Sequence, residues 1–113
     1  MRFSLIFILA SLFLSACSYN ELPLCDNENP SYKECIKPIF SEHCVSCHNQ
    51  QQSEILILEN YNQISGAVNS GHVIDRISRD KSDPLFMPLG SPKLTTSQIQ
   101  LIINWKANGA LNN

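Results

Sequence analysis

The sequence predicts a small all-α domain, and the placement of helix-capping residues is the main reason. Ser31, Asn60 and Thr95 can each cap a helix, and each is followed three residues later by Glu or Gln. No series of alternating polar and apolar residues indicates several paired strands, and there is no internal repeat. Of the 113 residues, about 97 follow the expected signal peptide, which is enough for one domain with a modest core.

The first helix is expected to begin after Ser31 and to run toward Cys44, with apolar Ile36 and Phe40 on one face. Pro38 stands inside this segment and has no backbone N–H. The helix must therefore kink at this proline or start again there.

Three more helices are expected after a short apolar run. That run, 54–58 (EILIL), is taken as extended, although periodicity alone does not separate a short strand from a helix. Capping residues then predict a short helix over about 60–68 and another over 71–79. The last helix begins at the cap formed by Thr95 and stops near Gly109, where glycine commonly ends a helix.

The chain begins with the pattern of an exported bacterial protein. Arg2 precedes the apolar run 3–14, which is shorter than the roughly 20 residues that a membrane-spanning helix needs. The run ends in residues 14–17 (LSAC), which resemble the site where a lipoprotein signal is cut before a cysteine. Residues 1–16 are therefore expected to be a lipoprotein signal peptide, with acyl chains on Cys17. An ordinary cleavage site with a chance cysteine is the alternative.

Acyl chains on Cys17 would hold the mature protein to a membrane of the bacterial cell envelope, with the domain facing the periplasm. Several chains on one residue anchor a protein durably, whereas a single chain is marginal. The polar segment 17–30, broken by Pro23 and Pro30, is expected to be the lipidated N-terminus and tether. Residues 31–113 then form the folded domain.

The segment 44–48 (CVSCH) has the spacing of a c-type haem attachment site. In that motif Cys44 and Cys47 bond the haem covalently, and His48 reaches its iron. On a helix these positions would also be neighbours, since residues i, i+3 and i+4 share one face. The motif therefore predicts a haem cofactor.

The five cysteines of the chain can be assigned without a leftover thiol. Cys17 is assigned to lipid, and Cys44 and Cys47 are assigned to haem. Cys25 and Cys35 remain. In an oxidising exported compartment they are expected to form a disulfide, rather than two free buried thiols.

The haem iron has a second axial position, and Met87 is the first candidate for it. It is the only methionine left after the signal is removed, and it lies in segment 83–92, where three prolines and a glycine restrict the backbone. His72 is the rival ligand, in a bis-histidine arrangement. His43 is expected to point away from the His48 side of the turn and carries little weight.

A buried haem also needs an apolar pocket that excludes water and tunes its potential. The side chains expected to form this pocket are Ile36, Phe40, Leu85, Ile102 and Trp105.

Several short segments together resemble the small single-haem bacterial cytochromes c. The segments are 38–40, 44–48, 87–94, 99–105 and 109–110. The resemblance covers about residues 31–113, and it implies a first helix that crosses the last one near a covalent haem c. Carried over to this chain, it attaches the haem at Cys44 and Cys47. The resemblance also implies that His48 and Met87 are the axial ligands of the iron. It further implies a carrier of single electrons rather than an enzyme, with redox partners that the sequence does not identify.

Two other classes of function stay open. In a haem-based ligand sensor or a minor peroxidase, Met87 would dissociate and an exogenous ligand would bind the iron. In a zinc-binding structural lipoprotein, two thiolates and two imidazoles would hold the metal. The candidate zinc ligands are Cys44, Cys47, His48 and His72. A formal net charge of -2 and singly scattered basic residues indicate no nucleic-acid partner.

Overall fold

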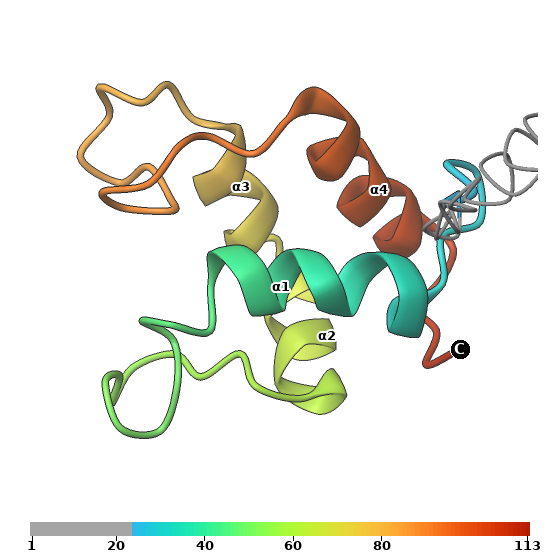
Figure 1. Cartoon of the computed structure of the whole chain (residues 1–113), viewed down its shortest axis with the longest axis horizontal. Coiled ribbons are helices and arrows are strands. Elements are labelled where there is room, and N and C mark those ends of the chain that lie inside the picture. Colours follow the sequence, from blue (N-terminus) through green and yellow to red (C-terminus); the bar gives the residue numbers. More distant parts are fainter. Residues whose placement is uncertain (1–23) are drawn as a thin grey trace, which may run out of the picture.

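Helices form the framework of the part of the chain that the structure describes. In this computed structural model the described residues are 24–113, and they contain no strand (Figure 1). In chain order the elements are the π-helical turn η1 (Tyr32–Ile36), α1 (Lys37–His43), α2 (Tyr61–Asn69), α3 (His72–Ser78) and α4 (Thr96–Ala107). The predicted all-α class is confirmed for these residues. None of their helices is both long enough and apolar enough to cross a bilayer. The signal peptide expected over 1–16 and the lipidation expected at Cys17 lie outside the described residues.

The first helix begins where the sequence predicts, but its geometry changes at Pro38. The hydroxyl oxygen of Ser31 caps the helix, because it accepts a hydrogen bond from the backbone N–H of Glu34 at 3.3 Å. The first turn is π-helical, and the N–H of Ile36 donates to the carbonyl of Ser31 at 3.2 Å. The α-helix then starts with Pro38 in its first turn, where a missing N–H costs least. The helix therefore restarts at the proline, and it ends at His43.

The two short helices in the middle of the chain form where their caps predict them. α2 begins with a capping box, in which the side chains of Asn60 and Gln63 each accept a hydrogen bond from the other residue's backbone N–H. α3 follows Gly71, whose φ of 86° lies in the left-handed region that glycine adopts without strain. The segment 54–58 is neither helix nor strand.

α4 is the longest helix among the described residues. Thr95 and Gln98 form its predicted capping box. After its last turn Gly109 has a φ of 90°, and the N–H of Ala110 donates to the carbonyl of Trp105 at 2.8 Å. α4 packs against η1, α2 and α3, so it connects the other helices (Figure 1).

The core lies where these helices meet α4. Its largest fully buried side chains are Trp105, Phe40, Ile36, Ile64, Ile102 and Val68. At one end of the core, Tyr32 stacks on Trp105 with 5.7 Å between ring centroids, and Tyr61 meets both rings edge-on. The phenol of Tyr61 also donates to the carbonyl of Ala110 at 2.8 Å, which ties α2 to the chain end.

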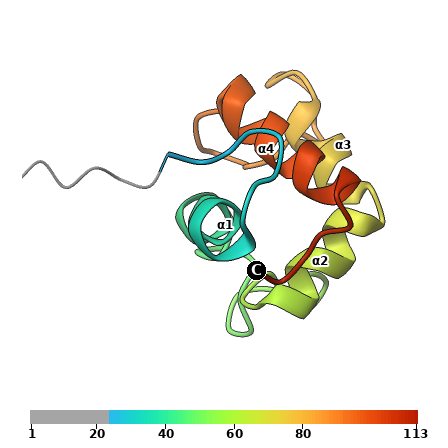
Figure 2. The same cartoon turned by 90° about the vertical axis from the view of Figure 1, so that its right-hand side faces the viewer.

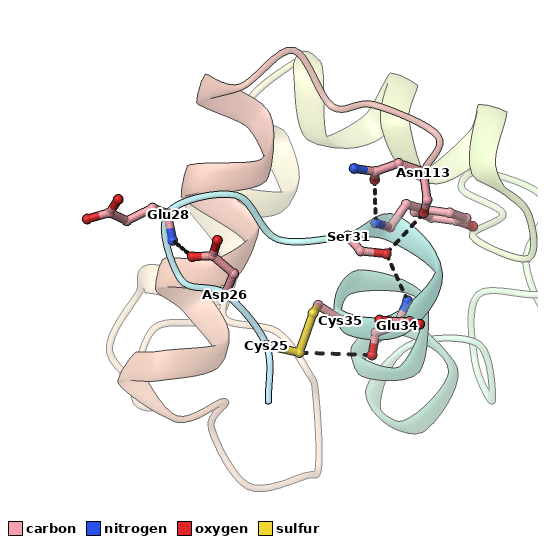
Figure 3. Close-up of a disulfide and its surroundings, with 8 residues drawn as sticks. Cys25, Asp26, Glu28, Ser31, Glu34, Cys35 and Asn113 are labelled. Carbon is pink, nitrogen blue, oxygen red and sulfur yellow. Dashed lines mark hydrogen bonds between the residues drawn. A yellow bond between two sulfur atoms is a disulfide. The ribbon is translucent and has the colours of Figure 1, made fainter. Parts of the chain in front are cut away.

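Residues 25–30, for which the sequence predicts a tether, are fastened to the domain. A disulfide joins Cys25 to Cys35 in η1, in agreement with the cysteine assignment (Figure 3). The side-chain amides of Asn104 in α4 and of Asn108, the C-cap of that helix, donate to main-chain carbonyls of this segment. Figure 2 shows the segment running past α4 into α1. The folded unit therefore begins near Cys25.

The C-terminal residue closes the same end of the molecule. The main-chain oxygen of Asn113 accepts a hydrogen bond from the hydroxyl of Ser31 at 3.1 Å (Figure 3), and it accepts another from the N–H of Lys33 at 3.0 Å. Its side-chain oxygen accepts the N–H of Tyr32 at 2.9 Å. These bonds satisfy N–H groups in the first turn of a helix, which have no partner within the helix itself.

Candidate functional site

A cavity of about 710 Å³ lies beside segment 44–48 (CVSCH), the predicted haem-attachment motif. The turn after α1, segment 53–58, α3 and segment 87–91 line it. The loops among these parts lie at the end of the molecule away from the N-terminal entry, on the left in Figure 1. The volume is in the range of small-molecule and cofactor sites, so a ligand of that class can be accommodated.

The apolar wall of this cavity differs from the sequence-based expectation. Its apolar lining includes Leu56, Leu58, Val73 and Ile77. The expected residues Ile36, Phe40, Ile102 and Trp105 are buried in the helix core and do not line the cavity. Leu85 is 44 % exposed, so its assignment to a buried pocket is wrong. The reason is topological, because α3 and segment 53–58 supply the surface next to the motif.

The haem-attachment motif follows α1 as a turn and is not itself part of the helix. Cys44 is the C-cap of α1, and its carbonyl accepts the N–H of Cys47 at 3.2 Å and of His48 at 2.9 Å. These two bonds keep a helix-like spacing for one more turn. As a result both thiols and the imidazole lie at the wall of the same cavity.

The imidazole of His48 is oriented by the main chain. Its Nδ1 lies 3.0 Å from the carbonyl oxygen of Leu56, and a carbonyl can only accept a hydrogen bond. In the neutral imidazole Nδ1 therefore carries the proton, and Nε2 keeps the lone pair that a metal ion requires. The N–H of Leu58 donates in return to the carbonyl of His48 at 2.8 Å, which holds the two segments together.

The two thiols of the motif differ in their surroundings. Both are free of disulfides, with Cys44 half-buried and Cys47 exposed. Burial raises the pKa of the Cys44 thiol to about 11, so it is neutral near pH 7. In residues 24–113 no three His, Cys, Asp or Glu side chains are grouped closely enough to hold a metal ion.

Met87 also lines the cavity, on the segment between α3 and α4. It is half-buried between buried Phe86 and Pro88. Its backbone N–H donates to the carbonyl of Arg76 in α3 at 3.2 Å. The structure therefore brings Met87 into the same cavity as His48, although the two are far apart in the sequence.

The other two histidines line the cavity as well. His72 is the exposed first residue of α3, and it lines the same cavity as Met87. His43, which was expected to point away from the His48 side, is also among the residues at the cavity wall. Its Nε2 is 3.2 Å from Nε2 of Gln98, the capping-box residue of α4. This contact connects the end of α1 to the start of α4.

Two groups that take part in the contacts of this candidate site were not identified from the sequence. One is the carbonyl of Leu56, and the other is Arg76, which contacts the Met87 segment through both its main chain and its side chain. The carbonyl is a main-chain group and carries no residue signature. The Arg76 contact joins residues that no local pattern connects.

The donor set fits a covalently attached haem. Two thiols, an imidazole with a free Nε2 and a thioether line one cavity with apolar walls. His48 and Met87 would hold the iron, and Cys44 and Cys47 would hold the porphyrin. Comparison of the chain with models of protein families, with curated proteins and with solved structures finds no match.

Proposed function

We propose that this protein is a small c-type cytochrome that carries single electrons through one covalent haem. In this proposal Cys44 and Cys47 attach the haem, and His48 and Met87 are its axial ligands. The proposal also makes the protein a lipoprotein of the bacterial cell envelope, attached through Cys17, with redox proteins as its partners.

The observation that carries the proposal is the orientation of His48 within the motif. A C-x-x-C-H sequence could occur by chance, but here Nδ1 is bonded to the carbonyl of Leu56 and the ring lies at the wall of a cofactor-sized cavity. Metal-ligating histidines commonly donate their second ring N–H to such a carbonyl, which fixes the ring and its tautomer. The sequence motif and the local geometry therefore support the same cofactor.

Electron transfer is the chemistry that this chain's own residues favour. Met87 approaches the cavity from a different segment than His48, so both axial positions can be filled by protein groups. An iron with both positions filled has no open site for a substrate. A methionine ligand raises the potential of a haem, and apolar walls such as Leu58 and Ile77 exclude water from it.

The lipid anchor is supported by the sequence alone, through residues 14–17 (LSAC). A Cys17→Ala variant is expected to move from the membrane pellet to the soluble fraction, with its haem domain unchanged. Retention of that variant in the pellet would contradict the anchor, and would leave the haem proposal in place.

Covalent haem attachment is tested on the full chain, expressed in a bacterium that assembles c-type cytochromes. After denaturing electrophoresis, the wild type is expected to stain for haem, and a Cys44→Ser/Cys47→Ser variant is not. A Cys25→Ser/Cys35→Ser variant is the matched control, because it also removes two sulfurs and should keep the stain. A wild-type band without haem would overturn the proposal and would favour a site of another kind.

A ligand sensor or peroxidase is distinguished by adding carbon monoxide to the reduced protein. If Met87 stays bound, the absorbance spectrum is expected to be unchanged. A rapid spectral change at low carbon monoxide concentration would show an accessible iron and would contradict the electron-carrier proposal.

A further inference from the structure

The segment that carries Met87 has little regular structure of its own. Residues 79–95 connect α3 to α4 through turns and bends, with no helix or strand. A loop of this kind depends on contacts outside itself for a defined position. An axial ligand needs a defined position, because a small displacement would break its bond to the iron. The contacts that hold this segment to α3 are therefore of functional interest.

Arg79 links the end of α3 to the start of this segment. Its Nε and Nη2 lie 3.1 and 3.3 Å from the two carboxylate oxygens of Asp75, which is a two-pronged contact. Its Nη1 donates to Oδ2 of Asp83 at 2.9 Å. One planar guanidinium thus joins a carboxylate on the helix to a carboxylate on the loop.

Asp83 connects the Arg79 guanidinium to the backbone of the residues that precede Met87. Its second oxygen, Oδ1, accepts the N–H of Leu85 at 2.7 Å, and its main-chain carbonyl accepts the N–H of Phe86 at 3.0 Å. The Leu85 N–H and the Arg79 guanidinium lower the pKa of Asp83, although its partial burial opposes them. The carboxylate is therefore charged near pH 7 and keeps both contacts.

Arg76 holds the residues next to Met87 directly. Its carbonyl accepts the N–H of Met87 at 3.2 Å, and its Nη1 donates to the carbonyl of Leu85 at 3.3 Å. At the far end of the segment, Nζ of Lys93 donates to the carbonyls of Ser78 and Arg79. Segment 79–95 is thus attached to the C-terminal part of α3 at three places, which are the start of the segment, the residues beside Met87 and the end of the segment.

We propose that Arg76, Arg79 and Asp83 are positioning residues that hold the Met87 thioether in place toward the haem iron. The proposal rests on the proposed function, because it needs Met87 as an axial ligand. None of the three residues is itself a ligand, and each acts through the backbone of the loop.

The expected effect is local to the loop. Exposed or half-exposed ion pairs contribute little to global stability, and the Arg79 guanidinium and Asp83 carboxylate are each about one third exposed. They can still change how often the loop opens, because each contact that is lost lowers the free energy that holds the loop against α3. The apparent affinity of an external ligand for the iron rises in proportion to that open fraction.

The test is a titration of the oxidised holoprotein with imidazole, followed by absorbance. In Arg79→Gln and Asp83→Asn we expect imidazole to bind about two- to fivefold more tightly than in wild type, with weakening of the absorption band diagnostic of methionine–iron ligation. Arg79→Lys should be intermediate, because an ammonium cannot contact both carboxylates in the same geometry. The urea midpoint of global unfolding should stay close to that of the control.

Asp26→Asn is the matched control. Asp26 also uses Oδ1 to accept a backbone N–H two residues ahead, that of Glu28 at 2.9 Å, but it lies in the segment joined to α4 and far from Met87 in sequence. Equal imidazole affinity in Asp83→Asn, Arg79→Gln and this control would overturn the positioning role. If the wild type lacks the methionine–iron band, the proposed axial ligand fails first and the positioning role fails with it, so the two failures are distinguishable.

Discussion

Nδ1 of His48 lies 3.0 Å from the main-chain carbonyl oxygen of Leu56, eight residues later in the chain. This hydrogen bond selects the tautomer in which Nε2 can bind a metal ion. The hydroxyl oxygen of Ser53 accepts the N–H of Leu56 at 3.1 Å, so a side chain also holds the main chain at Leu56. A bond to a carbonyl also makes the imidazole a stronger electron donor.

We expect Ser53→Ala to raise the reduction potential of the haem. Without the hydroxyl, the Leu56 carbonyl is held less firmly, and its bond to His48 weakens. A less basic imidazole stabilises oxidised iron less, so reduction becomes easier. Spectroelectrochemical titration measures the change. Ser65→Ala is the control, because that hydroxyl bonds to a carbonyl within α2 and does not line the cavity. Equal potentials in the two variants would contradict the prediction.

Met87→Ala is expected to abolish the methionine–iron band of the oxidised protein and to lower the reduction potential, because a methionine ligand raises it. His72→Ala should leave both unchanged, although His72 lies at the wall of the same cavity. Absorbance spectra and a redox titration of the two variants make the comparison. The opposite result, in which only His72→Ala alters the spectrum, would assign the axial position to the histidine.

Removal of the disulfide is expected to destabilise the domain without changing the haem spectrum. The Cys25–Cys35 bond closes a loop of sequence separation 10, for which chain entropy predicts a loss of about 2–3 kcal/mol. Neither cysteine lines the cavity beside segment 44–48. Urea unfolding of Cys25→Ser/Cys35→Ser, followed by circular dichroism, gives the free energy. An altered haem spectrum in this variant under native conditions would show that the disulfide also shapes the cavity.

Thr95→Ala is expected to lower the free energy of unfolding by about 1 kcal/mol, because Thr95 Oγ1 accepts the N–H of Gln98 at 3.1 Å at the start of α4. Thr96→Ala is the matched control. It removes the same hydroxyl from the next, exposed position, which is the first residue of the helix rather than its cap. Chemical denaturation of both variants measures the difference. Equal losses would mean that the cap contributes nothing specific.

Acid is expected to weaken the attachment of segment 79–95, which carries Met87, to α3. Hydrogen bonds from Ser82 lower the pKa of Asp80, and the N–H of Leu85 lowers that of Asp83. A carboxyl group with a lowered pKa in the folded state stabilises that state above its ordinary pKa, which is about 3.9 for aspartate. This contribution disappears as the pH falls through the lowered value.

Below about pH 4 the methionine–iron absorption band of the oxidised wild type should therefore weaken more steeply than that of Asp83→Asn, in which one of these carboxylates is absent. Absorbance spectra at a series of pH values between 6 and roughly 2.5 provide the two curves. Parallel curves would show that Asp83 does not contribute to the acid sensitivity.

The elements that the sequence predicted well are those whose signals are local. The capping pairs Asn60–Gln63 and Thr95–Gln98 each satisfy backbone donors within one turn, so the helix starts can be located without the rest of the fold. The haem-attachment motif is also local, since its chemistry depends on residues three and four apart. The cavity was predicted less well, as Leu85 illustrates, because its walls depend on how α3 and segment 53–58 are placed.

By itself, the sequence determined the all-α class of the described residues, the helix starts, the pairing of Cys25 with Cys35 and the motif that predicts a haem. Only the tertiary structure decided that the carbonyl of Leu56 orients His48 and that Arg76 holds Met87. The physical reason is the range of the interactions. A capping bond is closed by neighbours in the chain, whereas these two contacts involve main-chain carbonyls that every residue possesses and that only the packed fold brings into position.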